Sequence, residues 1–141
     1  MGKSRIARVL VAAMVVALVC GCAIFGRGPT DEELITKTIE EYSAALAAKD
    51  IDRALAAYSE DFQGESGGGK DDIRQLFAGA IDAGYLDDLE MDDTDCEIEI
   101  DGKTATVGPV EYSSAMGSMS FEFTMKKEAD GMWRIIDVYG Y

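Results

Sequence analysis

The sequence predicts an α+β domain in which amino-terminal helices pack on one face of a curved antiparallel sheet. Between residues 30 and 83, apolar side chains recur about every four positions, whereas after residue 95 they alternate with polar ones. Asp-Gly pairs at 101–102 and 130–131 separate the alternating stretches, as turns between antiparallel strands do. Helices followed by such strands form one helical layer on one sheet. The chain has 141 residues, which is enough for one domain with a modest core.

The first predicted helix runs from Thr30 to about Ala48. Thr30 and Glu33 form a capping-box pattern, and the acidic residues at 31–33 suit the positive end of a helix dipole. A single apolar stripe follows at helical spacing: Ile35, Ile39, Tyr42 and Leu46. We expect this stripe to face the core.

Two further helices are predicted before the strands begin. One starts at Asp50 and has Ile51, Leu55 and Tyr58 on its buried face. The other spans about Asp71 to Ala83, and Gly84 is its carboxyl-terminal stop. Four residues form its predicted buried face: Ile73, Leu76, Phe77 and Ile81.

The second half of the chain alternates like antiparallel strands. Cys96, Ile98 and Ile100 share one face before the first turn, and "FEFTM" at 121–125 alternates in the same way. Residues 132–141, "MWRIIDVYGY", form the final predicted strand. Cys96 is expected to be a small buried side chain of this sheet.

The order of these elements resembles the nuclear transport factor 2-like (NTF2-like) superfamily. The likeness rests on "EEYSAALAAKDIDRALAAYSEDF", the glycine-rich loop, a third helix, and a meander ending in "DGMWRIIDVYG". It covers Thr30 to Tyr141 and implies the cone-shaped, cystatin-like fold shared with steroid isomerases and SnoaL-type cyclases. Because that superfamily includes enzymes and plain binding modules, the resemblance implies a fold and not one activity.

The first 21 residues have the pattern of an export signal. A basic start precedes the unbroken apolar run Val9–Val19, which is followed by the small residues "CGC". Three interpretations fit: an ordinary cleaved signal, a lipoprotein signal, or a retained membrane anchor. The 18 uncharged residues at 9–26 are marginal for the last of these, because a spanning helix needs about 20.

The sequence "VCGC" at residues 19–22 resembles a bacterial lipobox and favours the lipoprotein interpretation. The resemblance implies a signal peptide at 1–21, acylation of Cys22, a lipidated tether at 22–29, and the domain at 30–141. Three acyl chains on one residue would hold the protein firmly at the membrane, because each buried CH₂ contributes about 0.8 kcal/mol. Ala23 after the cysteine implies the outer membrane of the cell envelope if the cell is Gram-negative.

The composition excludes several classes of function. After Cys22 there are 27 acidic and only 10 basic residues, so the mature chain carries a net charge of −17. Such a surface repels nucleic acid, and we expect no nucleic-acid partner. The absence of histidine excludes Ser-His and Cys-His nucleophiles. Cys20 leaves with the signal, and Cys96 alone makes neither a disulfide nor a zinc site; we expect no cofactor.

The stretch "GESGGGKD" at residues 64–71 resembles an incomplete phosphate-binding loop. A working loop has Ser or Thr after its lysine to hold magnesium, and here that residue is Asp71. Several other acids surround the same stretch and would repel phosphate. We interpret it as a flexible connection into the third helix. In the fold that the chain resembles, this loop lies at the rim of the cone, where it could act as a lid.

A second acidic stretch raises the question of a metal site. Ten acids and no bases lie between Asp82 and Asp101. Asp93, Asp95 and Glu97 have the spacing that opens an EF-hand loop, but Ile98 stands where glycine has to turn the chain. A solvated acidic face is our interpretation, with a weak surface calcium site as the alternative.

The resemblance also raises an isomerase hypothesis. In steroid isomerases a tyrosine on the first helix stabilises an oxyanion, and Tyr42 falls at the corresponding position. The base position falls at Ser66, with Glu65 one residue earlier, and the second oxyanion donor falls near Glu122. Glu122 alternates away from the apolar strand face, so we expect it to point to solvent.

We expect a binding protein more than an enzyme, with an apolar cavity behind the helices. The candidate lining residues are Tyr42, Tyr58, Phe62, Tyr112 and Trp133. The expected ligand is a small apolar molecule or a protein partner at the envelope. The alternative is an isomerase or dehydratase that uses Tyr42 with the rim carboxylate Glu65. A homodimer through the outer sheet face is also expected, and the methionines at 116, 119 and 125 would supply an adaptable surface or fill the interior.

Overall fold

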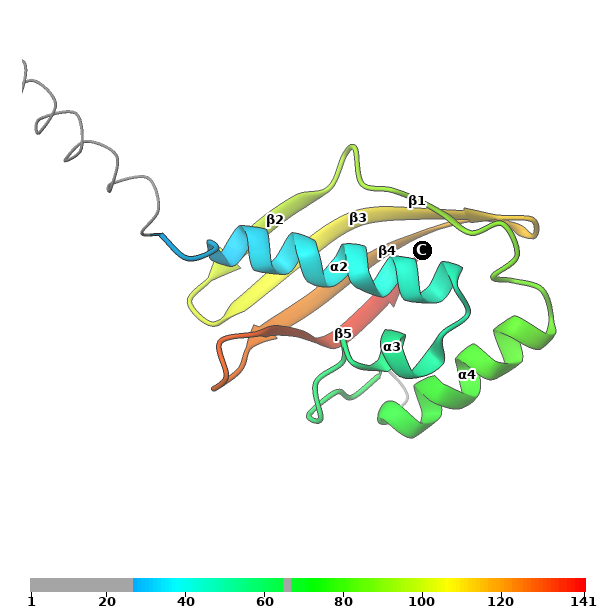
Figure 1. Cartoon of the computed structure of the whole chain (residues 1–141), viewed down its shortest axis with the longest axis horizontal. Helices are drawn as coiled ribbons and strands as arrows, with labels where there is room; N and C mark the ends of the chain where they lie inside the picture. The colour runs from blue at the N-terminus through cyan, green and yellow to red at the C-terminus, as the bar shows by residue number, and fades with distance from the viewer. Residues whose placement is uncertain (1–26, 65–66) are drawn as a thin grey trace, which may run out of the picture. The chain divides into compact units, whose positions relative to one another are not determined.

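Three helices precede five antiparallel strands in the computed structural model, which describes residues 27–64 and 67–141. The described elements are α2 (Asp31–Ala47), α3 (Ile51–Leu55), α4 (Lys70–Asp82), β1 (Glu90–Asp92), β2 (Glu97–Asp101), β3 (Thr104–Ser114), β4 (Gly117–Lys127) and β5 (Trp133–Gly140). All three helices lie on one side of the sheet (Figure 1). The predicted α+β class is therefore confirmed.

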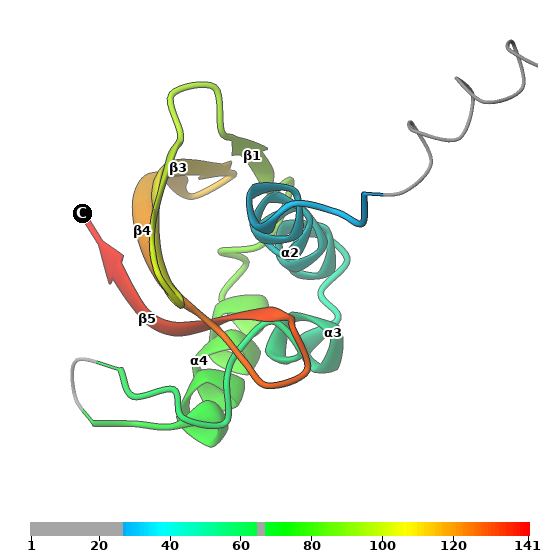
Figure 2. The same ribbon diagram turned by 90° about the vertical axis from the view of Figure 1, so that its left-hand side faces the viewer.

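The sheet is organised around the long strand β3. Its order is β1-β3-β4-β5. Strands β1 and β2 both pair with the same edge of β3: β1 with its second half and β2 with its first half. The pairing of β3 with β4 shifts register between Val107 and Val110, and a second shift follows Thr124 between β4 and β5. Such bulges bend strands, and Figure 2 shows the sheet curving around the helices. At the first bend, a Cβ on Gly108 would lie 3.1 Å from the backbone oxygen of Phe121.

Helix α2 fills the inner side of this curve. The four predicted stripe residues are all buried, the most exposed of them being Leu46 at 7%. The helix ends in a Schellman motif, in which Lys49 has a φ of 57° and its N–H donates to the carbonyl of Leu46, while the Asp50 N–H donates to the carbonyl of Ala45. Asp50 then caps α3, because its side chain accepts from the Arg53 N–H at 3.1 Å. This short link turns α3 back against α2.

The start of α2 is tied to the sheet by one carboxylate. Asp31 Oδ1 accepts from Lys127 Nζ at 2.6 Å and from the indole Nε1 of Trp133 at 3.0 Å. These hydrogen bonds lower the pKa of Asp31. Trp133 is 1% exposed and belongs to the closed core beneath the start of the helix.

Helix α4 differs from the sequence prediction. Of its four predicted core residues, only Phe77 is buried; Ile73 and Ile81 are half-buried, and Leu76 is 62% exposed. The apolar face of α4 was identified correctly, but it does not close onto the sheet.

Strand β2 is also less covered than predicted. Ile100 is 41% exposed, and Cys96 is half-buried instead of buried. The physical reason is that β2 lies at the sheet edge and pairs only with β3.

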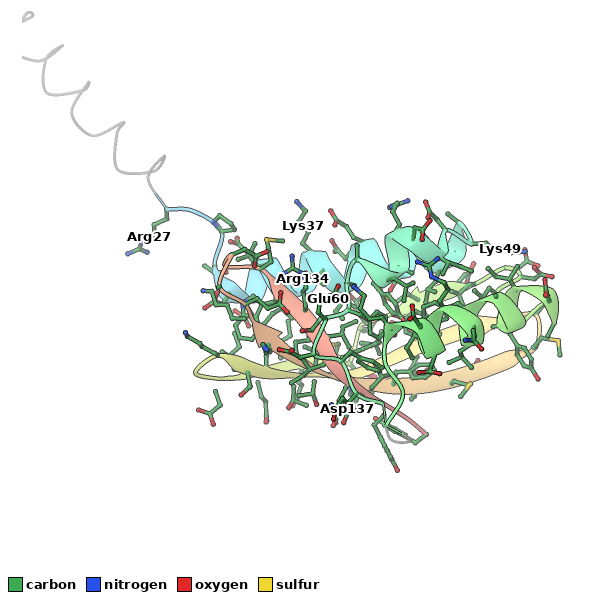
Figure 3. The ribbon with its side chains drawn as sticks, turned by 90° about the horizontal axis from the view of Figure 1, so that it is seen from below. Arg27, Lys37, Lys49, Glu60, Arg134 and Asp137 are labelled. Carbon is green, nitrogen blue, oxygen red and sulfur yellow. The ribbon has the colours of Figure 1, made fainter. Side chains whose placement is uncertain are left out.

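The outer face of the sheet is mainly polar. Exposed residues on β3, β4 and β5 include Glu111, Glu122 and Asp137. In Figure 3, Asp137 lies on the side of the sheet away from the helices. Tyr139 is an apolar exception, and its ring lies 5.8 Å from that of Tyr141. The expected homodimer through this face stays a prediction.

Among the described residues, the hydrophobic core lies within the unit Asp31–Tyr141. All its buried apolar residues lie between Ile35 and Ile135. A fragment of residues 27–141 therefore retains every core contact described in this structure and is the form proposed for solution experiments. The predicted signal and tether residues up to 26, including Cys22, lie outside the described residues, as do Glu65 and Ser66. Among the described helices, none has both the length and the apolar character needed to cross a membrane.

Candidate functional site

An apolar cavity of about 700 Å³ lies between α4, the last turns of α2 and the inner face of the sheet. The sheet contributes β3, β4 and β5 together with the β3–β4 hairpin tip. Apolar side chains predominate in the lining, with Leu46, Phe77 and Phe121 among them. The cavity exists because α4 covers this end of the curved sheet without filling it.

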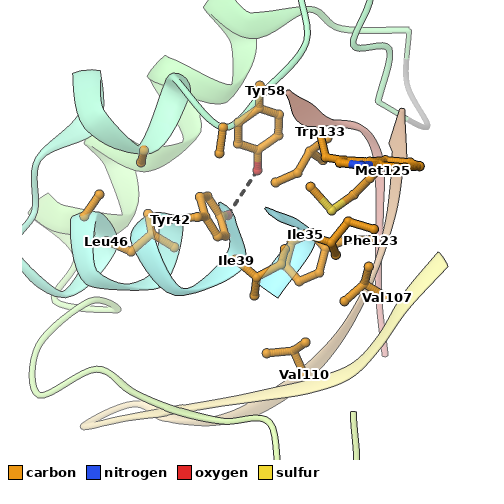
Figure 4. Close-up of a cluster of buried hydrophobic side chains, with 14 of the residues drawn as sticks. Ile35, Ile39, Tyr42, Leu46, Tyr58, Val107, Val110, Phe123, Met125 and Trp133 are labelled. Atoms are coloured by element: carbon orange, nitrogen blue, oxygen red, sulfur yellow. Dashed lines mark hydrogen bonds between the residues drawn. The ribbon is translucent and has the colours of Figure 1, made fainter. Parts of the chain in front are cut away.

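Two tyrosine hydroxyls form the main polar group of the lining. Tyr42 projects from α2 and Tyr58 from the segment after α3, and their hydroxyl oxygens lie 3.0 Å apart (Figure 4). The two rings meet edge to face, with centroids 5.7 Å apart. Two hydroxyl groups have two protons, and the hydrogen bond between them uses one of these protons. Among the described residues no further acceptor is found, so the pair can donate one hydrogen bond to a ligand.

A second polar pair joins Ser43, the next residue of α2, to Tyr112 of β3. Ser43 Oγ donates to the carbonyl of Ile39 at 2.8 Å, the usual bond of a serine within a helix. The Tyr112 hydroxyl lies 2.7 Å from Ser43 Oγ. Ser43 Oγ also lies 2.8 Å from Sδ of Met91. Either hydroxyl can be the donor between Ser43 and Tyr112, and their hydrogen bond ties α2 to β3.

Burial raises the pKa of these three tyrosines further above neutral pH. It raises the pKa of Tyr42 well above its ordinary value, and the neighbouring Tyr58 raises it further. Burial likewise raises the pKa of Tyr58, and that of Tyr112 to about 12. The site therefore offers hydroxyl groups and no ionised tyrosine near neutral pH.

The mouth of the cavity is lined by exposed apolar side chains. Leu76 of α4 is 62% exposed, and Met116 and Met119 at the hairpin tip are 58% and 54% exposed. Tyr85, which follows α4, is 53% exposed and also lines the cavity. Exposed apolar residues gathered around a cavity are typical of binding sites.

The glycine-rich loop contributes to this mouth. Gly64 and Gly68 line the cavity, and the Gly64 N–H donates to the Gly68 carbonyl at 2.9 Å. Lys70, the candidate phosphate ligand, begins α4 and binds Glu60 at 2.6 Å. The described part of the loop therefore supports a position at the rim.

The predicted site residues separate into three groups. Tyr42, Tyr58, Phe62 and Tyr112 line the cavity together. Trp133 does not line it; its indole binds Asp31 below the start of α2 instead. Glu65 lies outside the described residues.

Two other sequence hypotheses concern carboxylates. Glu122 is exposed on the outer face of the sheet, as its alternation indicated. For the acidic stretch, no three Asp, Glu or Cys side chains converge as metal ligands within residues 27–64 and 67–141.

Comparison with known proteins gives the fold. No family model matches the sequence, and no curated protein matches it. Solved structures do match. A protein of unknown function with a cystatin-like fold from Nostoc punctiforme is 20% identical, with a TM-score of 0.63 over 79% of this chain and 92% of that one. An NTF2-like protein of unknown function from Shewanella oneidensis is 18% identical, with a TM-score of 0.63, and the match covers 79% of this chain and 98% of that one.

A ketosteroid isomerase-like protein from Erwinia carotovora is also similar, at 21% identity and a TM-score of 0.52 over 79% of this chain and 96% of that one. The domain therefore has the NTF2-like, cystatin-like cone fold. At these identities the likeness defines the fold alone.

The raised pKa of Tyr112 predicts how stability depends on pH. In the unfolded chain a tyrosine loses its proton near pH 10, whereas folded Tyr112 keeps it until about pH 12. Between these values the unfolded state binds fewer protons, so stability falls as pH rises. In Tyr112→Phe the free energy of unfolding should fall less steeply with pH, by up to about 1.4 kcal/mol per pH unit.

Urea unfolding of the 27–141 fragment between pH 9 and 12 tests this, followed by Trp133 fluorescence. Phe121→Leu is the control, because it changes the same cavity without removing a titratable group. An identical pH slope in Tyr112→Phe and the unmodified fragment would contradict the assignment.

Proposed function

We propose that this chain is an exported lipoprotein, anchored to the cell envelope through acylated Cys22, whose NTF2-like domain binds a small apolar ligand. The observation that carries the binding function is the open apolar cavity of about 700 Å³. Its volume falls within the range of about 300 to 1,000 Å³ that is usual for small-molecule sites. Few polar groups line it, which suits a ligand held mainly by burial of apolar surface.

The anchoring proposal is supported by the sequence of the first 22 residues, and the domain geometry is compatible with it. The chain enters the domain at Asp31, the first residue of α2, whereas the cavity lies beside the last turns of that helix. Helix α2 has 17 residues and is therefore about 25 Å long. The proposed tether would therefore join the domain at the end of α2 that does not line the cavity.

The isomerase alternative receives less support from the geometry. Tyr42 lines the cavity and has a hydroxyl neighbour, as an oxyanion donor would need. Proton transfer also needs a carboxylate within hydrogen-bond reach of the substrate. Among the described residues no Asp or Glu is buried, and Asp72 at the mouth is the single acid of the lining. Retention of a ligand therefore fits the described site better than catalysis.

Obstructing the cavity should abolish binding. Ala80 lines the cavity on α4, whereas Ala78 is exposed and does not line it. We expect N-phenyl-1-naphthylamine, a neutral apolar fluorophore, to bind the 27–141 fragment with an increase in emission. Ala80→Trp should weaken this binding at least about tenfold, because the indole occupies ligand volume and each 1.4 kcal/mol lost is a factor of ten. Ala78→Trp is the matched control and should bind normally; equal effects of both variants would contradict the site.

Acylation should depend on a single cysteine. In bacteria that express the full chain and are fed labelled palmitate, we expect label on the protein and its loss in Cys22→Ala. Cys20→Ala should keep the label, because Cys20 precedes the proposed cleavage site. Intact mass should place Cys22 at the mature amino terminus. An unlabelled protein that retains residues 1–21 would instead support the membrane-anchor interpretation.

A further inference from the structure

We infer that the cavity selects amphiphiles with a positively charged head group and discriminates against anionic ones such as fatty acids. This inference rests on the proposed binding function and adds the chemical class of the ligand. It follows from where charges lie relative to the cavity.

The lining contains no cation. Among the described residues that line the cavity there is no Lys and no Arg, and there is one acid, Asp72. An anionic head group at the mouth would find no counter-ion there. At the deep end, the Tyr42–Tyr58 pair has a single proton to offer. One hydrogen bond does not replace the hydration of a carboxylate, so burial of an anion there is unfavourable.

Of the charged residues of helix α4, Asp72 alone lines the cavity. The face that lines the cavity comprises Asp72, Ile73, Leu76, Phe77 and Ala80. Asp72 Oδ2 accepts from the Gly69 N–H at 2.9 Å, and the carboxylate is exposed at the mouth. Among the described residues it forms no ion pair. Its second oxygen is available to a cation whose apolar tail occupies the cavity.

The two cations of α4 and Lys49 are paired with carboxylates. Lys70 binds Glu60 at 2.6 Å, and Arg74 binds Asp52 at 2.7 Å. Lys49, at the end of α2, binds Asp87. These cations already have counter-ions, and the chain after Cys22 has a net charge of −17, which favours a cationic ligand over an anionic one.

Three amphiphiles with the same tail test the inference: decylammonium, decanol and decanoate. Each displaces N-phenyl-1-naphthylamine from the 27–141 fragment at low ionic strength and below its aggregation concentration. We expect decylammonium to bind at least about tenfold more tightly than decanoate, with decanol between them. Raising the salt concentration should reduce the differences in affinity among the three amphiphiles, because salt screens exposed charges.

Two variants with the same change in net charge test whether Asp72 is the residue that favours the cationic head group. Asp72→Asn keeps an acceptor for the Gly69 N–H and should weaken decylammonium binding about threefold, as loss of an exposed ion pair does, without changing decanol binding. Asp71→Asn changes the neighbouring exposed acid of α4, which does not line the cavity, and should have a smaller effect.

The outcomes separate the two proposals. Equal or tighter binding of decanoate, or equal effects of Asp71→Asn and Asp72→Asn, would overturn the head-group inference while leaving apolar binding intact. Failure of both decanol and the fluorophore to bind would overturn the proposed function, and the inference with it.

Discussion

The curvature of the sheet is the constraint on which the rest of this structure depends. The register shifts after Val107 and Thr124 bend the long strands around a concave inner face. Helix α2 closes one end of that concavity with its buried stripe, and the Asp31–Trp133 hydrogen bond fixes it there. Helix α4 covers the other end with Phe77 as its one buried side chain. The cavity is the volume that this arrangement leaves unfilled.

The chemistry of the cavity follows from its surroundings. An apolar lining lowers the local dielectric constant, so the tyrosines stay protonated and pair with each other or with Ser43. Within residues 27–64 and 67–141 no charged side chain is buried, and Lys70 and Arg74 have carboxylate partners. An interior of this kind suits apolar groups, which supports the proposed binding function. The proposed lipid anchor rests on the sequence of the first 22 residues alone.

Periodicity predicted much of this fold, because it reports which face of an element is apolar. It identified the α2 stripe, the final strand and the turn glycines, of which Gly102 and Gly131 have φ values of 62° and 82°. It does not report what an apolar face meets. Leu76 belongs to the apolar face of α4, yet that face borders a cavity and Leu76 is exposed.

The same limit explains the outcome for the candidate site. Tyr42, Tyr58 and Tyr112 were identifiable as inward-facing residues, and they line the cavity. Trp133 is equally inward-facing, but its place along β5 sets it beside Asp31 at the closed end. Met116 and Met119 were noted as adaptable residues, although only the hairpin between β3 and β4 places them at the mouth. Position along a strand depends on tertiary pairing, which alternation does not encode.

The most direct test of a ligand cavity is nuclear magnetic resonance of methionine methyl groups in the 27–141 fragment titrated with decanol. Met116 and Met119 line the cavity, whereas Met132 is exposed on a different part of the domain and does not line it. Saturable shifts at Met116 and Met119, with Met132 unmoved, are the predicted result. Shifts that are absent, or that affect Met132 equally and never saturate, would contradict the central claim.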